Sequence, residues 1–364
     1  EKATSKLTQF GLKLISFISE TINVAKDNIS LTEGQKILTD NFLKKKRIIV
    51  YIDDLDRGWE GKKEDIIRIS ALLNAIRDLS NENSGLLFKV SLRSDVYYLV
   101  RTSDESTDKI EGSVVWCKWT NHEILVLLIK RILTYFGDSV DENTLMKTPQ
   151  LHLRFHLERV MESTFSGRGK WENVYMYKIL MSLIRKRPRD LVKLCSLAAQ
   201  QAQQTNSPLI KTEHFQAIFE EYSQGRIQDT INEYKSELPN IENLLFGMRP
   251  TKKQRNASDG YIYTTAELIQ KLNNIRQHTN FIFKNGRKAS ANELAQFLYK
   301  INFLTARKIV ESGEIQRKYF EENRYISSSF VDFGYDWEVH PAFRWVLQPE
   351  NINEIFNKLA LSHD

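Results

Sequence analysis

The stretch Arg47–Arg57, RIIVYIDDLDR, decides how this chain is interpreted, because an apolar run in it ends in acidic residues. Ile48–Ile52 is uninterrupted and rich in β-branched side chains, which is typical of a strand buried on both faces inside a parallel sheet. Asp53 and Asp54 follow directly. Because ligands bind at the carboxyl edge of the sheet in open α/β folds, this order predicts that both carboxylates lie at such an edge.

The segments around this stretch alternate between helical and strand patterns. Helical spacing is found at residues 5–26 and 31–42, before the first strand. After it we expect a helix over Glu64–Leu79, a strand over Leu86–Leu92, a short helix over Val96–Val100, a third strand over Ser113–Trp119, and a long helix that ends at Tyr135 and is capped by Thr120 or Asn121. This alternation predicts a partial parallel α/β sheet with right-handed crossovers.

The strand signals stop after about residue 137. Four helices are expected, over 142–165, 172–185, 188–204 and 212–235, with loops at Phe165–Lys170 and Gln203–Pro208. From about Pro250 the pattern predicts helices at Thr265–Arg276, Ser290–Ile301 and Phe303–Ile315, then a β-hairpin formed by Tyr325–Phe333 and Tyr335–Val339. The predicted domains are therefore an α/β core over 1–137, a helical subdomain over 138–249 and a winged-helix-like domain over 250–364.

Composition limits the class of protein. The 364 residues, 41% of them hydrophobic, are enough for two or three domains. The longest aliphatic run, Ile124–Ile129, is far too short to span a membrane, so we expect a cytoplasmic protein without membrane contact. Cys117 and Cys195 have no CxxC spacing, which favours reduced thiols. A net charge of +6 permits nucleic-acid contact but is weak support for it.

The acidic residues after the first strand suit a magnesium site. Mg²⁺ prefers oxygen ligands and keeps several waters, so one or two carboxylates suffice. Asp53 would hold Mg²⁺ through water, and Asp54 would orient or deprotonate an attacking water. Acids after apolar strands are also common at solvated loops, so this pattern alone leaves a purely structural interpretation open.

The order of three motifs resembles a known class. IDDLDR, then LRSD, then RPRDLV, separated by the predicted helices and strands, is similar to the AAA+/STAND class of P-loop ATPases over most of residues 36–205. More narrowly, the chain resembles bacterial families related to the KAP and STAND groups, whose members recur in antiphage defence. The resemblance implies ATP and Mg²⁺ as cofactors, Asp53 and Asp54 as the Walker B acids, and Asp56 and Arg57 as the acid and base that follow them.

The resemblance also assigns roles to arginines. Arg93 stands near the sensor 1 position, although that residue is usually Asn or Thr, and a salt bridge to Asp54, Asp56 or Asp95 is an equal alternative. Arg187 is the first choice and Arg189 the second for sensor 2. Pro188 suits the first turn of a helix and Asp190 complements the dipole of that helix, so these arginines lie at a helix start. A solvated basic helix end is the alternative there.

A phosphate-binding loop is missing from the sequence. GxxxxGK[ST], whose backbone amides hold phosphates, does not occur in it, and Gly167–Lys170 is not one because no strand precedes it. We expect the first strand and this loop to lie elsewhere, on a longer chain or a partner subunit, so that the chain alone is inactive. A non-hydrolysing relative is the less favoured alternative.

These observations predict a nucleotide-driven switch in a bacterial defence or signalling ATPase. ATP would bind between the α/β core and the helical subdomain, which acts as a lid, and a homo-oligomer or a partner protein would complete the site. A rival is an initiator-type nucleic-acid-binding protein, in which a basic patch lies beside the winged helix. The residues of that patch are Lys252, Lys253, Arg255, Lys284, Arg287 and Lys288. A third possibility is a structural interaction domain with ATPase ancestry.

Overall fold

The computed structural model describes residues 47–103, 105–167, 169–251, 260–309, 315–322 and 334–347. Over these residues the chain is a mixed α/β protein with small sheets and many helices. It divides into two compact units. Of the described residues, the first unit contains 47–55, 68–92 and 105–112, and the second contains the rest. The helices predicted at 5–26 and 31–42 lie outside the described residues.

The first unit is built on two parallel strands. β1 (Ile48–Ile52) pairs with β2 (Leu86–Val90) along their full length, from Ile48 opposite Leu86 to Ile52 opposite Val90. α3 (Lys63–Glu82) lies between the strands in sequence, and Glu64 and Asp65 in its first turn suit the positive end of the helix dipole. The parallel pairing and the connecting helix predicted from the sequence are therefore confirmed.

Two details of the predicted sheet are wrong. β1 alternates between half-buried and exposed residues, with Ile49 47% and Tyr51 76% exposed, so it is not buried on both faces. Ser113–Trp119 forms no strand. The chain enters the second unit at Ser113, after the 3₁₀ helix η2 (Glu105–Ser113), and the segment finds no neighbouring strand to pair with. Trp116 instead packs edge-on against Tyr97, with 5.4 Å between ring centroids.

After η2, the helical part of the second unit continues with α5 (Asn121–Tyr135). Thr120 caps it, and its hydroxyl and Glu123 form a reciprocal capping box, as the sequence suggested. The helix expected over 142–165 is instead α6 (Glu142–Lys147) and α7 (Gln150–Leu157), because Pro149 disfavours helical geometry at the residue before it and begins the next helix.

Another expected helix, over 172–185, starts later. Its first residues form β4 (Glu172–Tyr175), which pairs antiparallel with β3 (Thr164–Ser166), and α8 (Met176–Leu183) follows. α9 (Pro188–Gln204) and α10 (Thr212–Tyr234) are confirmed as predicted.

An antiparallel sheet and its helices follow α10. The elements are α11 (Ile241–Gly247), β5 (Ile262–Tyr263), α13 (Thr265–His278), α14 (Ala291–Lys300), β6 (Leu304–Ile309), β7 (Ile315–Lys318) and β8 (Asp336–Val339). The strand order is β5-β8-β6-β7. The helix predicted over Phe303–Ile315 is wrong: Asn302 takes a left-handed conformation, φ 56°, and the chain leaves α14 as strand β6. Tyr335–Val339 is confirmed as a strand over its last four residues, whereas Tyr325–Phe333 lies outside the described residues.

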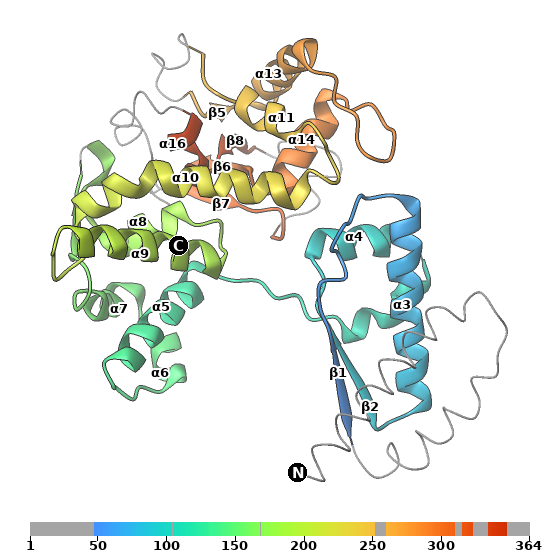
Figure 1. Cartoon of the computed structure of the whole chain (residues 1–364), viewed down its shortest axis with the longest axis horizontal. Helices are drawn as coiled ribbons and strands as arrows, with labels where there is room; N and C mark the ends of the chain where they lie inside the picture. Colours follow the sequence, from blue (N-terminus) through green and yellow to red (C-terminus); the bar gives the residue numbers. More distant parts are fainter. Residues whose placement is uncertain are drawn as a thin grey trace. The chain divides into compact units, whose positions relative to one another are not determined.

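α10 joins two hydrophobic cores inside the second unit. Phe215, Phe219 and Tyr222 from its first half pack in a core with α5, α8 and α9, while Ile227 and Tyr234 pack in a core with α13, α14 and the antiparallel sheet. Figure 1 shows α10 running across this unit, with α9 on one side and α16 (Arg344–Leu347) on the other. No described helix is both long and apolar enough to cross a bilayer.

Candidate functional sites

Three side chains gather where β1 and β2 end. Asp53 and Asp54 follow β1, and Ser91 follows β2. The Ser91 amide donates a hydrogen bond to the Ile52 carbonyl oxygen at 2.9 Å, which continues the parallel pairing by one residue. The Asp53 carboxylate accepts hydrogen bonds from the Ser91 hydroxyl and, at 2.9 Å, from the Asp54 amide. We call Asp53, Asp54 and Ser91 the acidic edge.

The backbone of the acidic edge is strained. Asp54 has φ 58°, in the left-handed region that non-glycine residues seldom enter. Aspartate tolerates this region better than most residues, but strained backbone persists chiefly where the surrounding structure imposes it, often at functional sites. Both Asp53 and Asp54 are exposed, so their oxygens can reach a hydrated cation.

Ser91 was missed by the sequence analysis, which singled out Arg93 in the same motif. The signal was available in the strand pattern. Asp53 is the first polar residue after β1, and Ser91 is the first residue after β2. Because Ile52 pairs with Val90, the next residue of each strand lies opposite the other. The residue that the structure brings to Asp53 is therefore Ser91.

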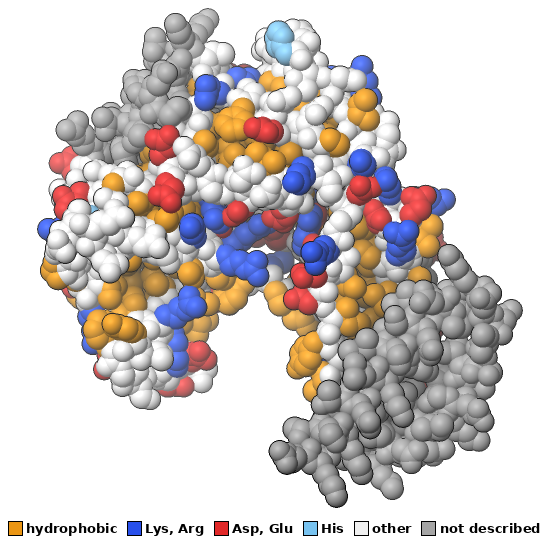
Figure 2. All heavy atoms as spheres, viewed as in Figure 1, with side chains coloured by type: hydrophobic (Ala, Val, Ile, Leu, Met, Phe, Trp, Pro, Cys, Tyr) orange, Lys and Arg blue, Asp and Glu red, His pale blue; other side chains and the backbone are white. Residues whose placement is uncertain are grey.

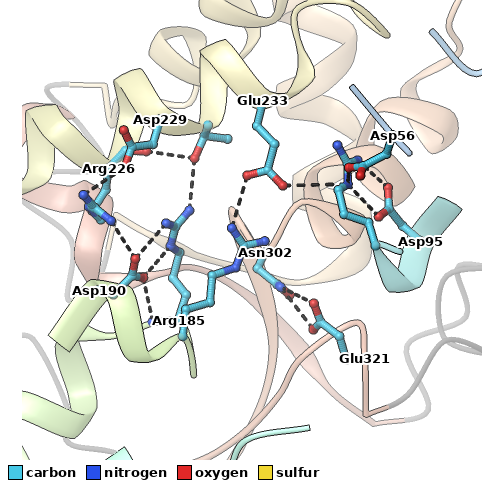
Figure 3. Close-up of polar contacts among 12 residues, drawn as sticks. Asp56, Asp95, Arg185, Asp190, Arg226, Asp229, Glu233, Asn302 and Glu321 are labelled. Atoms are coloured by element: carbon cyan, nitrogen blue, oxygen red, sulfur yellow. Dashed lines mark hydrogen bonds and ion pairs between the residues drawn. The ribbon is translucent and has the colours of Figure 1, made fainter. Parts of the chain in front are cut away.

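A second group, in the other unit, surrounds two of the predicted arginines. Arg93 immediately precedes α4 (Ser94–Ser103), Arg187 is the N-cap residue of α9, and Glu233 is the next-to-last residue of α10. Glu233 accepts a hydrogen bond from Arg187 at 3.2 Å and is 3.8 Å from the Arg93 Nε atom (Figure 3). We call Arg93, Arg187 and Glu233 the arginine group.

Arg93 has further acidic partners. Its guanidinium donates two hydrogen bonds to Asp95, at 2.7 and 3.1 Å, and lies 3.5 Å from an Asp56 oxygen. It also stacks over the Tyr234 ring, 4.6 Å from the centroid. The sequence left two roles open for Arg93, a sensor 1 residue that contacts phosphate or the partner in an internal salt bridge. The structure shows salt bridges of Arg93 with Asp56 and Asp95.

Electrostatics keep both arginines charged. Burial disfavours the charge on Arg93, but Asp95 and Glu233 outweigh that effect and raise its pKa above the ordinary value. For Arg187, burial is likewise opposed and outweighed by Glu233, which raises its pKa. The side chains remain 21% and 33% exposed, so a small anion could reach them.

The other predicted binding residues take no part in these contacts. Arg57 and Arg189 are both exposed. Asp190 is not a simple dipole partner but a buried acid: it accepts two hydrogen bonds from the Arg185 guanidinium, at 2.8 and 3.0 Å, one from the Arg185 amide at 3.2 Å, and one from Arg226 at 2.7 Å. These cations outweigh the effect of burial and hold the pKa of Asp190 well below its usual range. Figure 3 shows Asp190 between Arg185 and Arg226. We infer that this buried cluster stabilises the fold.

The described part of the predicted basic patch is partly neutralised. Arg287 forms an ion pair with Glu293 at 2.5 Å, and Lys284 is 3.8 Å from Glu60. Lys288 is exposed. Lys252, Lys253 and Arg255 lie outside the described residues. Within the part of the chain that the structure describes, no three His, Cys, Asp or Glu side chains converge as a ready-made metal site.

Comparison with known proteins gives two likenesses. Residues 151–231, from α7 to α10, match the FunZ-associated C-terminal helical domain. The chain is also 21% identical over 360 residues to the putative transposon gamma-delta 80.3 kDa protein of Escherichia coli (strain K12), a match that covers 92% of this chain and 46% of that protein. The chain thus spans about half the length of this relative. No solved structure matches.

Proposed function

We propose that the chain carries the Walker B part of a bacterial AAA+/STAND-type ATPase that works as a nucleotide-dependent switch. The observation that supports this most is the acidic edge, where Asp53, Asp54 and Ser91 meet at the carboxyl end of two parallel strands. This is where ligands bind in open α/β sheets. A carboxylate and a hydroxyl beside exposed solvent also suit Mg²⁺, which prefers oxygen ligands and retains water.

Roles follow from these positions. Asp53 would hold Mg²⁺ through water, with Ser91 fixing the orientation of its carboxylate, and Asp54 would orient the water that attacks ATP. Bound Mg²⁺ would neutralise charge on the phosphates. Arg93 and Arg187 would contact phosphate oxygens, which bidentate guanidinium groups recognise well. We include in this proposal the catalytic roles of Arg93 and Arg187. We also propose that the phosphate-binding loop lies on another part of a longer protein.

Hydrolysis of ATP by the full-length protein tests this proposal. Asp54→Asn keeps the size of the side chain and removes its ability to accept a proton, so we expect hydrolysis to fall by about a hundredfold or more. Asp78→Asn is a matched control, because Asp78 is an exposed acid of the first unit that pairs with Arg77 on α3. Equal rates for the parent protein and Asp54→Asn would remove the assignment.

The exposed apolar surface of α7 favours a second function, protein–protein interaction. Leu151 and Phe155 are 45% and 52% exposed, one helical turn apart, and hydrophobic side chains are visible on the surface over this helix (Figure 2). Leu151→Ser combined with Phe155→Ser should lower the oligomer mass measured by light scattering, whereas His152→Ser on the same helix should not. An unchanged mass would leave this surface without a role in assembly.

The nucleic-acid alternative has weaker support. The order α13, α14, β6, β8, with β5 at the sheet edge, is compatible with a winged-helix-like domain. However, most of α14 is buried, and its first turn carries Glu293, which pairs with Arg287. Such a helix offers a duplex little positive charge. Salt-dependent duplex binding by the chain would restore this alternative, and absence of binding at low salt would end it.

A further inference from the structure

Glu233 occupies the position that an anion would take in the arginine group. Its two carboxylate oxygens are divided between two cations: one accepts the hydrogen bond from Arg187, and the other faces Arg93 (Figure 3). Two arginines arranged around one doubly coordinated acid resemble the way guanidinium groups surround a phosphate. The contact therefore places two cations together while keeping them neutralised.

Glu233 and Asp95 hold Arg93 in different ways. Asp95 binds the guanidinium of Arg93 through two hydrogen bonds and lies two residues after it in sequence, in the first turn of α4. Glu233 lies 3.8 Å away and makes a single contact. Arg93 would consequently stay in place if Glu233 moved, because its strongest partner would remain.

The position of Glu233 makes it easy to displace. It is the next-to-last residue of α10, where the helix dipole is negative and disfavours a carboxylate. The arginine group also borders a small pocket, which is lined by Lys300 and Tyr234 and by the acids Asp95 and Glu321, and Lys300 is itself paired with Glu237. Open space thus adjoins the two arginines that Glu233 now binds.

We propose that Arg93 and Arg187 form a binding site for the phosphates of a nucleotide, and that Glu233 closes this site as an internal competitor. A polyphosphate replaces the Glu233 carboxylate on both arginines, while Asp95 keeps Arg93 oriented. Binding and closure are mutually exclusive, so the affinity of the site is lowered by the stability of the Glu233 contacts. The inference rests on the proposed function in taking the anion to be a nucleotide phosphate.

The test is the binding of inorganic pyrophosphate to the intact chain, measured by isothermal titration calorimetry without magnesium. Glu233→Gln keeps the shape of the side chain but removes its charge, so affinity should rise about tenfold, within the usual range of coupling between competing states. Glu221→Gln is the matched control, because Glu221 is an exposed acid of the same helix and does not line the pocket beside Arg93 and Arg187. Its affinity for pyrophosphate should match that of the parent chain.

Two results would overturn the proposal. One is equal affinity in Glu233→Gln and the parent chain, with both folded by circular dichroism. The other is a gain that survives in the double variant Arg187→Gln with Glu233→Gln, since the site would then not involve Arg187. Because pyrophosphate binding needs neither Asp54 nor hydrolysis, failure here leaves the Asp54→Asn result intact, and a failed Asp54→Asn test leaves the anion site intact.

Discussion

The acidic edge and the arginine group differ in the kind of partner that the described residues give them. In the acidic edge, exposed carboxylates follow a strand, and Asp53 meets a serine hydroxyl and a backbone amide. In the arginine group, two cations share Glu233, and one of them also binds Asp95 and Asp56. Under the proposed function, the acids would take up an incoming cation directly, whereas the arginines would first exchange one partner for another.

We expect the largest change in stability at Asp190, a buried acid that belongs to neither group. Its carboxylate is 1% exposed and holds Arg185 and Arg226. Asp190→Asn leaves the buried Arg185 guanidinium without its acid and removes one of the two acids of Arg226, so the free energy of unfolding should fall by about 3–5 kcal/mol in urea titration. Asp229→Asn, which removes an acid that is 56% exposed, should cost under about 1 kcal/mol. Similar losses in both variants would show that Asp190 is no more important than a surface acid.

A pH dependence should follow from Glu338, a second buried acid among the described residues. Burial opposes its ionisation, but Arg317 and Arg344 outweigh that and lower its pKa from 4.5 to about 2. A depressed folded-state pKa stabilises the fold above the unfolded value, and that stabilisation is lost as pH falls from about 4.5 to 2.

The measurement is the free energy of unfolding between pH 5 and pH 2. Glu338→Gln should be less stable than the parent chain at pH 5, and the difference should shrink toward pH 2. A constant difference across this range would show that ionisation of Glu338 does not stabilise the fold.

At the acidic edge we expect large changes in activity with small changes in stability. Ser91→Ala removes the hydroxyl that orients Asp53, so ATP hydrolysis by the full-length protein should fall about tenfold, while the unfolding free energy changes by about 1 kcal/mol or less. Ser84→Ala, at an exposed serine in the turn before β2, serves as control. If both variants hydrolyse ATP alike, Ser91 does not position Asp53.

The smallest effect concerns the backbone of Asp54. Because φ is 58° there, Asp54→Ala retains the Cβ strain, whereas Asp54→Gly relieves it. We expect the glycine variant to be more stable than the alanine variant by about 1 kcal/mol in thermal unfolding, although both lose ATP hydrolysis. The reverse order of stability would mean that the left-handed conformation is not maintained in solution.

Local signals predicted the regular elements well. The apolar run of β1, the Thr120 cap of α5 and the Pro188 start of α9 are each encoded within a few residues. The strand predicted at 113–119 and the helix predicted at 303–315 failed for tertiary reasons, because pairing partners and the left-handed Asn302 decide those segments.

The candidate sites were predictable to different degrees. Asp53 and Asp54 could be placed at a sheet edge because strand order alone fixes that position. Ser91 needed the register between two strands, and Glu233 could not be foreseen, because α10 brings it from 46 residues beyond Arg187. Contacts between distant segments leave no periodic trace in a single sequence.

One consequence of α10 concerns how the second unit comes apart. The helix has 23 residues, ~34 Å of continuous hydrogen-bonded backbone, and supplies side chains to both hydrophobic cores. Neither core can open widely without losing part of this helix, so the two should exchange their amide hydrogens with similar, slow rates, as one cooperative block. Gly225 lies between the two sets of core residues, and apart from its chain neighbours and the backbone of its own helix, no atom lies within 4 Å of where its Cβ would be, so this is the point where the block could be divided.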